Sequence, residues 1–303
     1  MVNKDIYYTQ ETCLTEDKVN LSDSELFLAV MKNKIAQECM LSIIMNEPDL
    51  KLKSVNVEEV IPNKKGKKMI RLDAYAEDDR GRIIDTEMQN DTGHDSIPKR
   101  VRYYIGRLDA SLLFAGQKYP YKELPELVVI FITPKDLFGK DHARYEFRSR
   151  CTELKDLEIN DGLRKLFLNM ESLEGDPVLV SLLQYMKDSR ITNPKIIVKD
   201  TRIQKLDEIV QEVKDSNEWR ELLVSLEERM EVRITKQIED RVTKQVTEHE
   251  KQKSAVAFIA ICADFNQTRD TTRKKMIEKL KVTEEEADRY LDEFWEEDQV
   301  SGS

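Results

Sequence analysis

The stretch RLDAYAEDDRGRIIDTEMQND, residues 71–91, decides how this sequence folds. It lies within two segments, 68–78 and 82–90, in which polar and apolar residues largely alternate, as they do in a half-buried β-strand. The three-residue link between them, 79–81, ends in a glycine and suits a type I turn followed by a left-handed residue. The sequence therefore predicts an antiparallel β-hairpin.

This turn determines which residues face each other across the hairpin. Opposed residues have numbers with a constant sum, so Asp73 lies opposite Glu87 and Arg71 opposite Gln89. Opposed Cβ atoms are about 4.5–5.5 Å apart, and two carboxylates at that distance repel each other. A divalent cation such as Mg²⁺ would offset the repulsion, because it prefers hard carboxylate oxygens. Two alternatives stay open: the carboxylates point into water, or a two-residue turn places Asp73 opposite Thr86.

The two faces of the predicted hairpin differ in chemistry. Because side chains alternate along a strand, the acidic residues share one face and the other face is mainly apolar. The residues of the mainly apolar face are Leu72, Ala74, Ala76, Ile84, Thr86 and Met88. We expect this face to pack on the core, which leaves the acidic face open to a substrate.

The segments around the hairpin predict a mixed α/β core. Residues 22–46 carry apolar side chains at helical spacing, residues 54–61 alternate like a strand, and residues 97–115 indicate a helix. The run LVVIFI, residues 127–132, is continuously apolar, as in a strand that is buried on both faces. The order is helix, three strands, helix and strand, which is typical of helices packed on a sheet.

The sequence after this core is richer in charge. Residues 141–200 predict mainly helices, and residues 203–250 are rich in Glu, Lys, Gln and Arg. Apolar residues recur there every four positions, whereas a coiled coil needs an average of about 3.5. These residues are Met230, Ile234, Ile238, Val242 and Val246. The segment is either a solvated helix or an arm through which the chain forms a homo-oligomer.

Composition and pattern together predict three parts. They are a core domain over 1–200, a charged helical arm over 201–250 and a small helical unit over 251–303. Within the last part, Thr283 and Glu286 have the spacing of a capping box at the start of a helix.

Composition also limits the classes of function. The chain has 303 residues, of which 40% are hydrophobic and 36% charged, and its net charge is −10. An acidic chain is not expected to bind nucleic acid indiscriminately, because phosphate contacts need Lys and Arg. Basic residues do form two clusters of the kind that binds phosphate. The first is equally well explained as a solvated loop, and the tyrosines of the second are more often core residues than platforms for stacked bases. The clusters are Lys64, Lys65, Lys67, Lys68 and Arg71, and Lys99, Arg100, Arg102 and Arg107 with Tyr103 and Tyr104 among them.

The cysteines and the hydropathy bear on location. The four cysteines are scattered, and no Cys or His pair has the spacing of zinc ligands. No signal-peptide pattern is visible, and no apolar run reaches the roughly 20 residues of a membrane span. We therefore expect a protein of the reducing cytoplasm that does not enter membranes.

Three stretches together resemble a known family. They are residues 71–91, KRVRYYIGRLDASLLFAGQKY at 99–119 and LPELVVIFIT at 124–133. The sequence resembles the PD-(D/E)XK nuclease superfamily, and more closely its recombination-promoting nucleases, which are described as PD-(D/E)XK nuclease family transposases. In that group an aspartate in the second strand precedes a Glu-x-Gln in the third. The matching residues here are Asp73 and Glu87-Met88-Gln89.

The resemblance implies a restriction-endonuclease-like core of the order α-β-β-β-α-β, with a long C-terminal helical extension. It implies Mg²⁺-dependent endonucleolytic cleavage of DNA, with Mn²⁺ as a substitute ion, in recombination or transposition. Asp73 and Glu87 would bind the metal through their carboxylates, and the carbonyl of Met88 would add a ligand. The expected partner is double-stranded DNA. The residues expected to bind it are Lys64, Lys65, Lys67, Lys68, Lys99, Arg102 and Arg107.

Gln89 departs from the superfamily pattern, which has a lysine at this position. A glutamine amide forms hydrogen bonds but cannot supply a positive charge. We predict that Arg100 or Arg71 supplies the charge instead. The first helix offers Glu25 and Glu38 as further acids, or as solvated helix residues. Two other functions stay open, an inactive nuclease-fold interaction protein and an RNA-cleaving or phage-defence effector.

Overall fold

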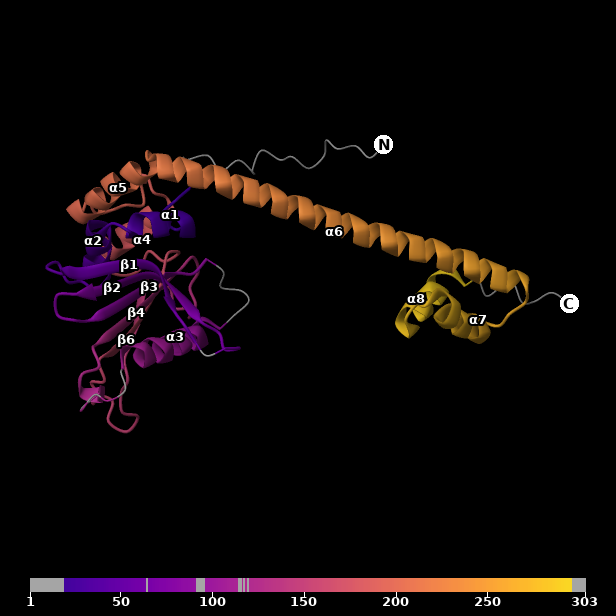
Figure 1. The fold of residues 1–303 in the computed structure, drawn as a ribbon, viewed down its shortest axis with the longest axis horizontal. Helices are drawn as coiled ribbons and strands as arrows, with labels where there is room; N and C mark the ends of the chain where they lie inside the picture. The colour runs from indigo at the N-terminus through magenta and orange to yellow at the C-terminus, as the bar shows by residue number, and fades with distance from the viewer. Residues whose placement is uncertain are drawn as a thin grey trace. The chain divides into compact units, whose positions relative to one another are not determined.

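A six-stranded mixed sheet forms the centre of the N-terminal part of the computed structural model (Figure 1). Its strands, in spatial order, are β1 (Leu52–Ile61), β2 (Ile70–Asp78), β3 (Ile83–Met88), β4 (Leu127–Thr133), β6 (Leu163–Asn169) and β5 (Arg144–Phe147). The first three strands form an antiparallel meander, β3, β4 and β6 run parallel, and β5 is antiparallel to β6. The predicted α/β class is confirmed.

The structure describes residues 19–63, 65–90, 96–113, 116, 118 and 120–295. The chain divides into two units, Met1–Val224 and Ser225–Ser303. The three-part division predicted from composition stays a prediction. Within the described ranges, no helix is long and apolar enough to cross a membrane.

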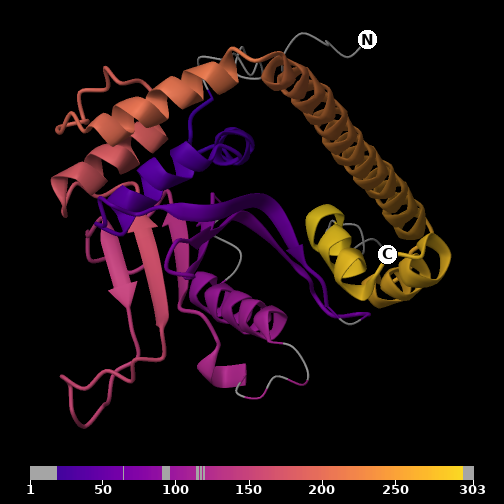
Figure 2. The ribbon, with the colours of Figure 1, turned by 60° about the vertical axis from the view of Figure 1, so that its left-hand side comes forward.

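Helices cover both faces of the sheet. They are α1 (Ser24–Met31), α2 (Lys34–Ile44), α3 (Ile97–Leu112), α4 (Pro177–Lys187) and α5 (Thr201–Lys214). Helix α3 lies along one face, and the other four helices lie on the opposite side (Figures 1 and 2). Because α3 connects β3 to the parallel strand β4, it has to cross back over the sheet. This crossover places α3 beside β3, the strand that carries Glu87.

The core between α3 and the sheet follows from the spacing of apolar residues in the helix. These residues recur every three or four positions, so they form one apolar face. Tyr104 of α3 and Phe131 of β4 meet edge to face, with ring centroids 5.9 Å apart. The buried residues of this helix are Ile97, Val101, Tyr104, Ile105 and Leu108, and those of β4 in the same cluster are Leu127, Val129 and Phe131.

The hairpin between β2 and β3 has the turn predicted from the sequence. Gly81 has a φ of 79°, in the left-handed region that favours glycine. The amide of Asp78 donates to the carbonyl of Arg82 at 3.0 Å, which closes the turn. The carboxylate of Asp78 also accepts a hydrogen bond from the amide of Arg82 at 2.7 Å.

The register of this hairpin is also as predicted. Tyr75 pairs with Asp85, and the same constant sum sets Asp73 opposite Glu87. The alternative of a two-residue turn, which would have set Asp73 opposite Thr86, is excluded.

Two predictions about helices are wrong. The segment 22–46, predicted as one helix, is divided into α1 and α2. Asn33 starts the second helix, because its side chain accepts hydrogen bonds from the amides of Ile35 and Ala36. The segment 141–200, predicted as mainly helical, contains the strands β5 and β6 besides α4. The apolar run of β6 is short and follows two basic residues, which conceals the strand pattern.

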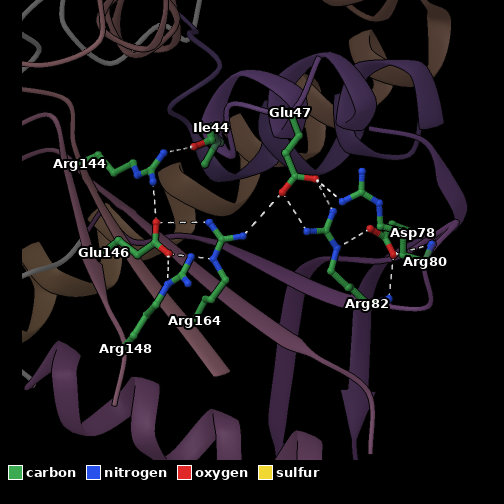
Figure 3. A network of polar contacts seen from close by, with 9 residues as sticks. All are labelled: Ile44, Glu47, Asp78, Arg80, Arg82, Arg144, Glu146, Arg148 and Arg164. Atoms are coloured by element: carbon green, nitrogen blue, oxygen red, sulfur yellow. Dashed lines mark hydrogen bonds and ion pairs between the residues drawn. The ribbon is translucent and has the colours of Figure 1, made fainter. Parts of the chain in front are cut away.

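A network of ion pairs fixes the end of the sheet at which β3 and β6 begin (Figure 3). Glu47, which follows α2, accepts hydrogen bonds from both terminal nitrogens of Arg82, at 2.9 and 2.6 Å. Arg82 Nε donates to the buried carboxylate of Asp78 at 2.6 Å. Arg164, near the start of β6, lies 3.7 Å from Glu47. Because the bonds from Arg82 favour its charged form, the pKa of Glu47 lies below its ordinary value.

The network continues onto β5. Glu146 forms ion pairs with Arg144 at 2.5 Å and with Arg148 and Arg164 at 2.8 Å each (Figure 3). Arg164 therefore links Glu146 to Glu47 and joins the two halves of the sheet. The candidate site described below lies at the opposite end of β3, so this network anchors the sheet without contributing to the site.

The second unit is helical. Its elements are the C-terminal part of α6 (Asn217–Asp264), α7 (Arg269–Lys275), the π-helical turn η3 (Met276–Leu280) and α8 (Glu284–Phe294). The helix predicted over 203–250 is therefore divided between α5 and α6. The predicted capping box of Thr283 and Glu286 is confirmed. The small core of this unit consists of Ala255, Ile259, Met276, Val282, Ala287, Tyr290 and Leu291.

Candidate active site

Asp73 of β2 and Glu87 of β3 are tied to each other across the hairpin. The amide of Asp73 donates to Glu87 Oε1 at 2.9 Å. In return, Asp73 Oδ2 accepts a hydrogen bond from the amide of Met88 at 3.0 Å. Each carboxylate is therefore held by the backbone of the opposite strand. This arrangement leaves Asp73 Oδ1 and Glu87 Oε2 as the oxygens that could bind a cation.

The face that carries these acids is covered, and the prediction that it is open to solvent is wrong. Glu87 is 1% exposed and Asp85 is 0% exposed, and only Asp73 is half-buried. The covering element is α3, whose Arg100 and Tyr104 lie over this end of β3. The crossover from β3 to β4 puts the helix there, and neither strand of the hairpin predicts it alone.

Burial changes the acidity of the three carboxyl groups. It raises the pKa of Glu87 to about 8, with the nearby charge of Asp73 as the second cause. Burial also raises the pKa of Asp73, and it raises the pKa of Asp85 well above its usual range. Neither carboxylate oxygen of Asp85 has a hydrogen-bond partner in the described part of the chain. The site therefore gathers three acidic groups whose charged forms are disfavoured by burial, although Arg100 offsets part of the charge on Glu87.

These carboxylates fit a hard divalent cation. A cation near Asp73 and Glu87 would offset their repulsion and the cost of their burial. No group of three His, Cys, Asp or Glu side chains in the described residues could hold a metal ion by itself. Two carboxylates are enough for Mg²⁺, which commonly takes one or two and completes its shell with waters and substrate phosphates.

Arg100 supplies a positive charge at this site. Its guanidinium donates a hydrogen bond from Nη1 to Oε1 of Gln89, and its Nη2 lies 3.6 Å from Glu87 Oε2. Tyr104, one turn further along α3, accepts hydrogen bonds from Arg100 Nη2 at 2.9 Å and from its Nε at 3.2 Å. The backbone of Gln89 is fixed to β4, since its amide donates to the carbonyl of Ile132 at 2.9 Å.

Arg71, the other predicted source of charge, lies differently. Its side chain is 63% exposed and forms an ion pair with Glu58 at 3.2 Å. The structure thus brings Arg100 to Glu87 and Gln89, and leaves Arg71 at the surface.

The two glutamates of the first helices do not join the carboxylate pair. Glu38 of α2 accepts hydrogen bonds from the amide of Leu52 at 3.0 Å and from Lys51 Nζ at 3.3 Å, so it anchors the start of β1. Glu25 of α1 is exposed.

The two basic clusters meet. The loop between β1 and β2 rests on α3, because Tyr103 donates from its hydroxyl to the carbonyl of Lys68 and accepts from Asn63 Nδ2 at 3.1 Å. Arg107 donates to the carbonyl of Pro62, so its guanidinium supports the loop. The basic residues exposed on this loop and on α3 are Lys65, Lys67, Lys68, Lys99 and Arg102. We call these five residues the basic surface. Lys64 lies outside the described residues.

Sequence reasoning missed two residues of the site. Tyr104 was expected to pack in the core rather than to stack on bases, and its burial confirms this, but its bonds to Arg100 were not predicted. Asp85 is fully buried beside the pair. Its position two residues before Glu87, and hence on the same face, was the available signal.

Comparison with known proteins gives one match. The family model described as PD-(D/E)XK nuclease family transposase matches residues 26–234. The match covers more than half of the 303 residues and includes the whole carboxylate site. No curated protein and no solved structure matches the chain.

Proposed function

The chain belongs to the PD-(D/E)XK nuclease family transposases, and we propose that it is a metal-dependent endonuclease that hydrolyses phosphodiester bonds of double-stranded DNA. Membership suggests nuclease activity and a nucleic acid substrate. The observation that carries the proposal to this chain is the cross-strand pair of Asp73 and Glu87, whose backbone hydrogen bonds leave one oxygen of each for a cation. We expect this cleavage to take part in recombination or transposition.

Asp73 and Glu87 hold the metal in this proposal, and the carbonyl of Met88 is a further ligand. The ion is Mg²⁺, with Mn²⁺ as a substitute. When bound, the ion supplies a Lewis acid that polarises the scissile phosphate and lowers the pKa of the attacking water. The protein supplies a largely buried environment around Glu87, in which electrostatic interactions are stronger than in water.

Arg100 provides the charge that the missing lysine supplies elsewhere in the superfamily. Its guanidinium remains protonated at any pH at which the protein is folded. It lies against Gln89 and Glu87, so it can stabilise the negative charge that develops on the phosphate. Gln89 orients this guanidinium by accepting its hydrogen bond.

The basic surface binds the DNA backbone in this proposal. The chain as a whole is acidic, with a net charge of −10, so the attraction to phosphate has to be local. Lys67 and Lys68 lie on the loop that Tyr103 holds against α3, and Arg102 precedes Tyr103 on that helix. The basic residues of the loop therefore lie on a segment that contacts the helix that carries Arg100 and Arg102.

A cleavage assay on two substrates tests the proposal. The protein is incubated with Mg²⁺ and either a DNA duplex or an RNA of the same sequence. Cleavage of the DNA alone is expected. Cleavage of RNA alone would indicate the RNA-cleaving alternative. Binding without cleavage of either would favour the inactive interaction protein, for which the loss of the lysine at Gln89 is the supporting observation.

We also propose that the chain forms a homodimer through α6. Every fourth residue from Met230 to Val246 is apolar, and these five residues are 36–51% exposed. Residues four apart form a ridge on the helix, and two such ridges pack at a crossing angle of about −50° rather than along a coiled coil. We call this ridge, Met230, Ile234, Ile238, Val242 and Val246, the α6 stripe.

Charges beside the α6 stripe favour a second copy in parallel orientation. The row on one side of the stripe is acidic at three positions, and the row on the other side is basic at three. In a parallel two-fold pair the acidic row of one copy faces the basic row of the other, whereas an antiparallel pair brings like rows together. The acidic row contains Glu227, Glu231 and Glu239, and the basic row contains Arg229, Arg233 and Arg241.

A further inference from the structure

Strand β1 contains a residue that departs from strand geometry. Glu58 has a φ of 53°, in the left-handed region, although it lies in the middle of the strand. A non-glycine residue pays a steric cost in this conformation, and a glutamate has no local hydrogen bond that favours it. The other described non-glycine residues with positive φ lie in loops and turns, and four of the five are Asn or Asp. They are Asn46, Asp141, Asn160, Asn266 and Lys281.

The residue that should pair with Glu58 is the proposed metal ligand Asp73. The register of β1 and β2 passes from the pair Val57–Ala74 directly to the pair Glu59–Leu72. The pair between them, Glu58 with Asp73, is missing, although the sum of the residue numbers is unchanged on both sides. The ladder therefore opens at this one position without a shift of register.

The opening redirects the amide of Asp73. In an antiparallel strand, successive residues direct their N–H and C=O groups to alternate neighbours. The amide of Asp78 donates to β3, so the amide of Asp73, an odd number of residues away, should donate to β1. It donates instead to Glu87 Oε1 on β3, at 2.9 Å. A regular strand at Glu58 would compete for this amide.

The side chain of Glu58 forms its ion pair with a residue other than Asp73 or Glu87. Its carboxylate forms an ion pair with the exposed Arg71 at 3.2 Å and is itself 49% exposed. The charge of this carboxylate is the last of the causes that shift the pKa of Asp73, after burial, the hydrogen bond from Met88 and the charges of Arg100 and Arg71. The proposal below therefore concerns the backbone conformation of Glu58, and its test has to separate the backbone from this charge.

We propose that Glu58 is a positioning residue: its left-handed backbone releases the amide of Asp73 from the β1–β2 ladder, and this amide then holds Glu87 in the orientation that binds the metal. The inference rests on the proposed function, because it concerns the same carboxylate pair. Strain of this kind persists only where the surrounding structure imposes it, and it collects at functional sites. Here the steric cost at Glu58 yields one hydrogen bond to the carboxylate of Glu87.

Variants at position 58 separate the backbone from the side chain. Glu58→Gly and Glu58→Asn tolerate the left-handed region and lack the carboxylate. Glu58→Val favours a regular strand. Asn56→Val is the matched control, because Asn56 is an exposed residue on the same face of β1 with an ordinary partner, Tyr75. Each full-length variant is first shown by circular dichroism and thermal melting to be folded.

Calorimetric titration with Mn²⁺ is the first measurement. We expect Glu58→Gly, Glu58→Asn and Asn56→Val to bind the ion as the unmodified protein does. Glu58→Val should bind it about 10- to 100-fold more weakly, as when an outer hydrogen bond to a ligand is removed. Equal binding by Glu58→Val would overturn the proposal. Weak binding by all three variants at position 58 would also overturn it, because the carboxylate would then be the active part.

The amide proton of Asp73, observed by NMR in the metal-free protein, is the second measurement. We expect Glu58→Val and Glu87→Gln each to move this resonance, whereas Glu58→Gly leaves it in place. This readout stands even if the unmodified protein binds no Mn²⁺, a result that would contradict the proposed function alone. An Asp73 amide resonance with the same chemical shift in Glu58→Val, in Glu87→Gln and in the unmodified protein would contradict the positioning role.

Discussion

The guanidinium of Arg100 donates a hydrogen bond to the side-chain oxygen of Gln89 and lies 3.6 Å from the carboxylate of Glu87. Arg100 comes from α3 and Gln89 from the end of β3, so the positive charge reaches the site from a different element. The side-chain amide of Gln89 accepts this hydrogen bond through its oxygen and so orients the arginine. Loss of the motif lysine is therefore compatible with catalysis.

Replacement of Arg100 should reduce the rate of cleavage more than it reduces the affinity of the protein for DNA. We expect Arg100→Ala to lower kcat by about 10²- to 10³-fold, the typical effect of removing one group that stabilises charge in the transition state. Arg71→Ala should have little effect on kcat, because Arg71 is exposed and paired with Glu58. Single-turnover cleavage at saturating DNA compares the two variants. A larger loss in Arg71→Ala would reverse the assignment.

A second substitution tests whether position 89 and Arg100 share one role. Gln89→Lys restores the superfamily's cation at the end of β3. In the Arg100→Ala background it should recover part of the lost rate, because one positive charge again lies beside Glu87. No recovery in the double variant, with the protein folded, would indicate that Arg100 acts in some other way.

Metal binding should depend steeply on pH. Burial, and secondly the charge of Asp73, raise the pKa of Glu87 to about 8. A carboxyl group has to lose its proton before it can bind a metal ion. Below about pH 8 the affinity for Mg²⁺ should therefore fall by up to about tenfold per pH unit for each proton displaced. Calorimetric titrations across this range measure the slope, and a flat profile would contradict the burial of Glu87.

The same shift has a consequence for the stability of the metal-free protein. The pKa of Glu87 in the folded chain lies above its ordinary value of 4.5. Between these two values the folded protein holds a proton that the unfolded chain has lost, so the free energy of unfolding should decrease as pH rises. Urea denaturation across this range should show the decrease, and Glu87→Gln should make it smaller. A loss of stability toward low pH over the same window would have the wrong sign.

The hairpin could be predicted because its signals are local. The glycine at position 81 and the alternation on both sides of it set the turn, and the turn sets the register of Asp73 and Glu87. The position of α3 over the acidic face could not be predicted from such local signals. It depends on the path of the chain from β3 to β4, and the burial of Asp85 and Glu87 follows from that path.

Other features of the site have no signal in one sequence. Nothing in the segment SVNVEEVI distinguishes Glu58, because a glutamate in a strand pattern is expected to be extended. Arg100 and Arg71 were equal candidates, since both are basic and near the motif. Only the packing of α3 on the sheet, with Tyr104 behind Arg100, separates them.

Binding of DNA should depend on the basic surface and on salt. Replacing Lys67 and Lys68 with alanine, or Arg102 alone, should weaken binding equally for DNAs of different sequence. The slope of log affinity against log salt should fall by about 1 for each phosphate that the protein no longer neutralises. Lys187→Ala is the control, because Lys187 is an exposed residue of α4, on the other side of the sheet. Unchanged affinity and slope in the first two variants would exclude this surface.

Self-association should depend on the α6 stripe. Ile238 is 50% exposed, so Ile238→Glu should leave the monomer folded and shift the dimer toward monomer in sedimentation experiments. Lys236→Gln changes the net charge equally on the opposite side of the helix and should have no effect. A chain with Arg233→Glu and Arg241→Glu should pair with one that carries Glu231→Arg and Glu239→Arg. Monomeric unmodified protein at high concentration would refute the pairing.

Cleavage of plasmid DNA by the Asp73→Asn variant tests the central claim most directly. The unmodified protein should cut the plasmid in Mg²⁺, and EDTA should stop the reaction. Asp73→Asn should lower the rate by more than about 100-fold, beyond the typical effect of losing an outer-shell partner, while its melting curve shows a folded protein. Cleavage that persists in Asp73→Asn, or in EDTA, would contradict the assignment of Asp73 and Glu87 as the metal-binding pair.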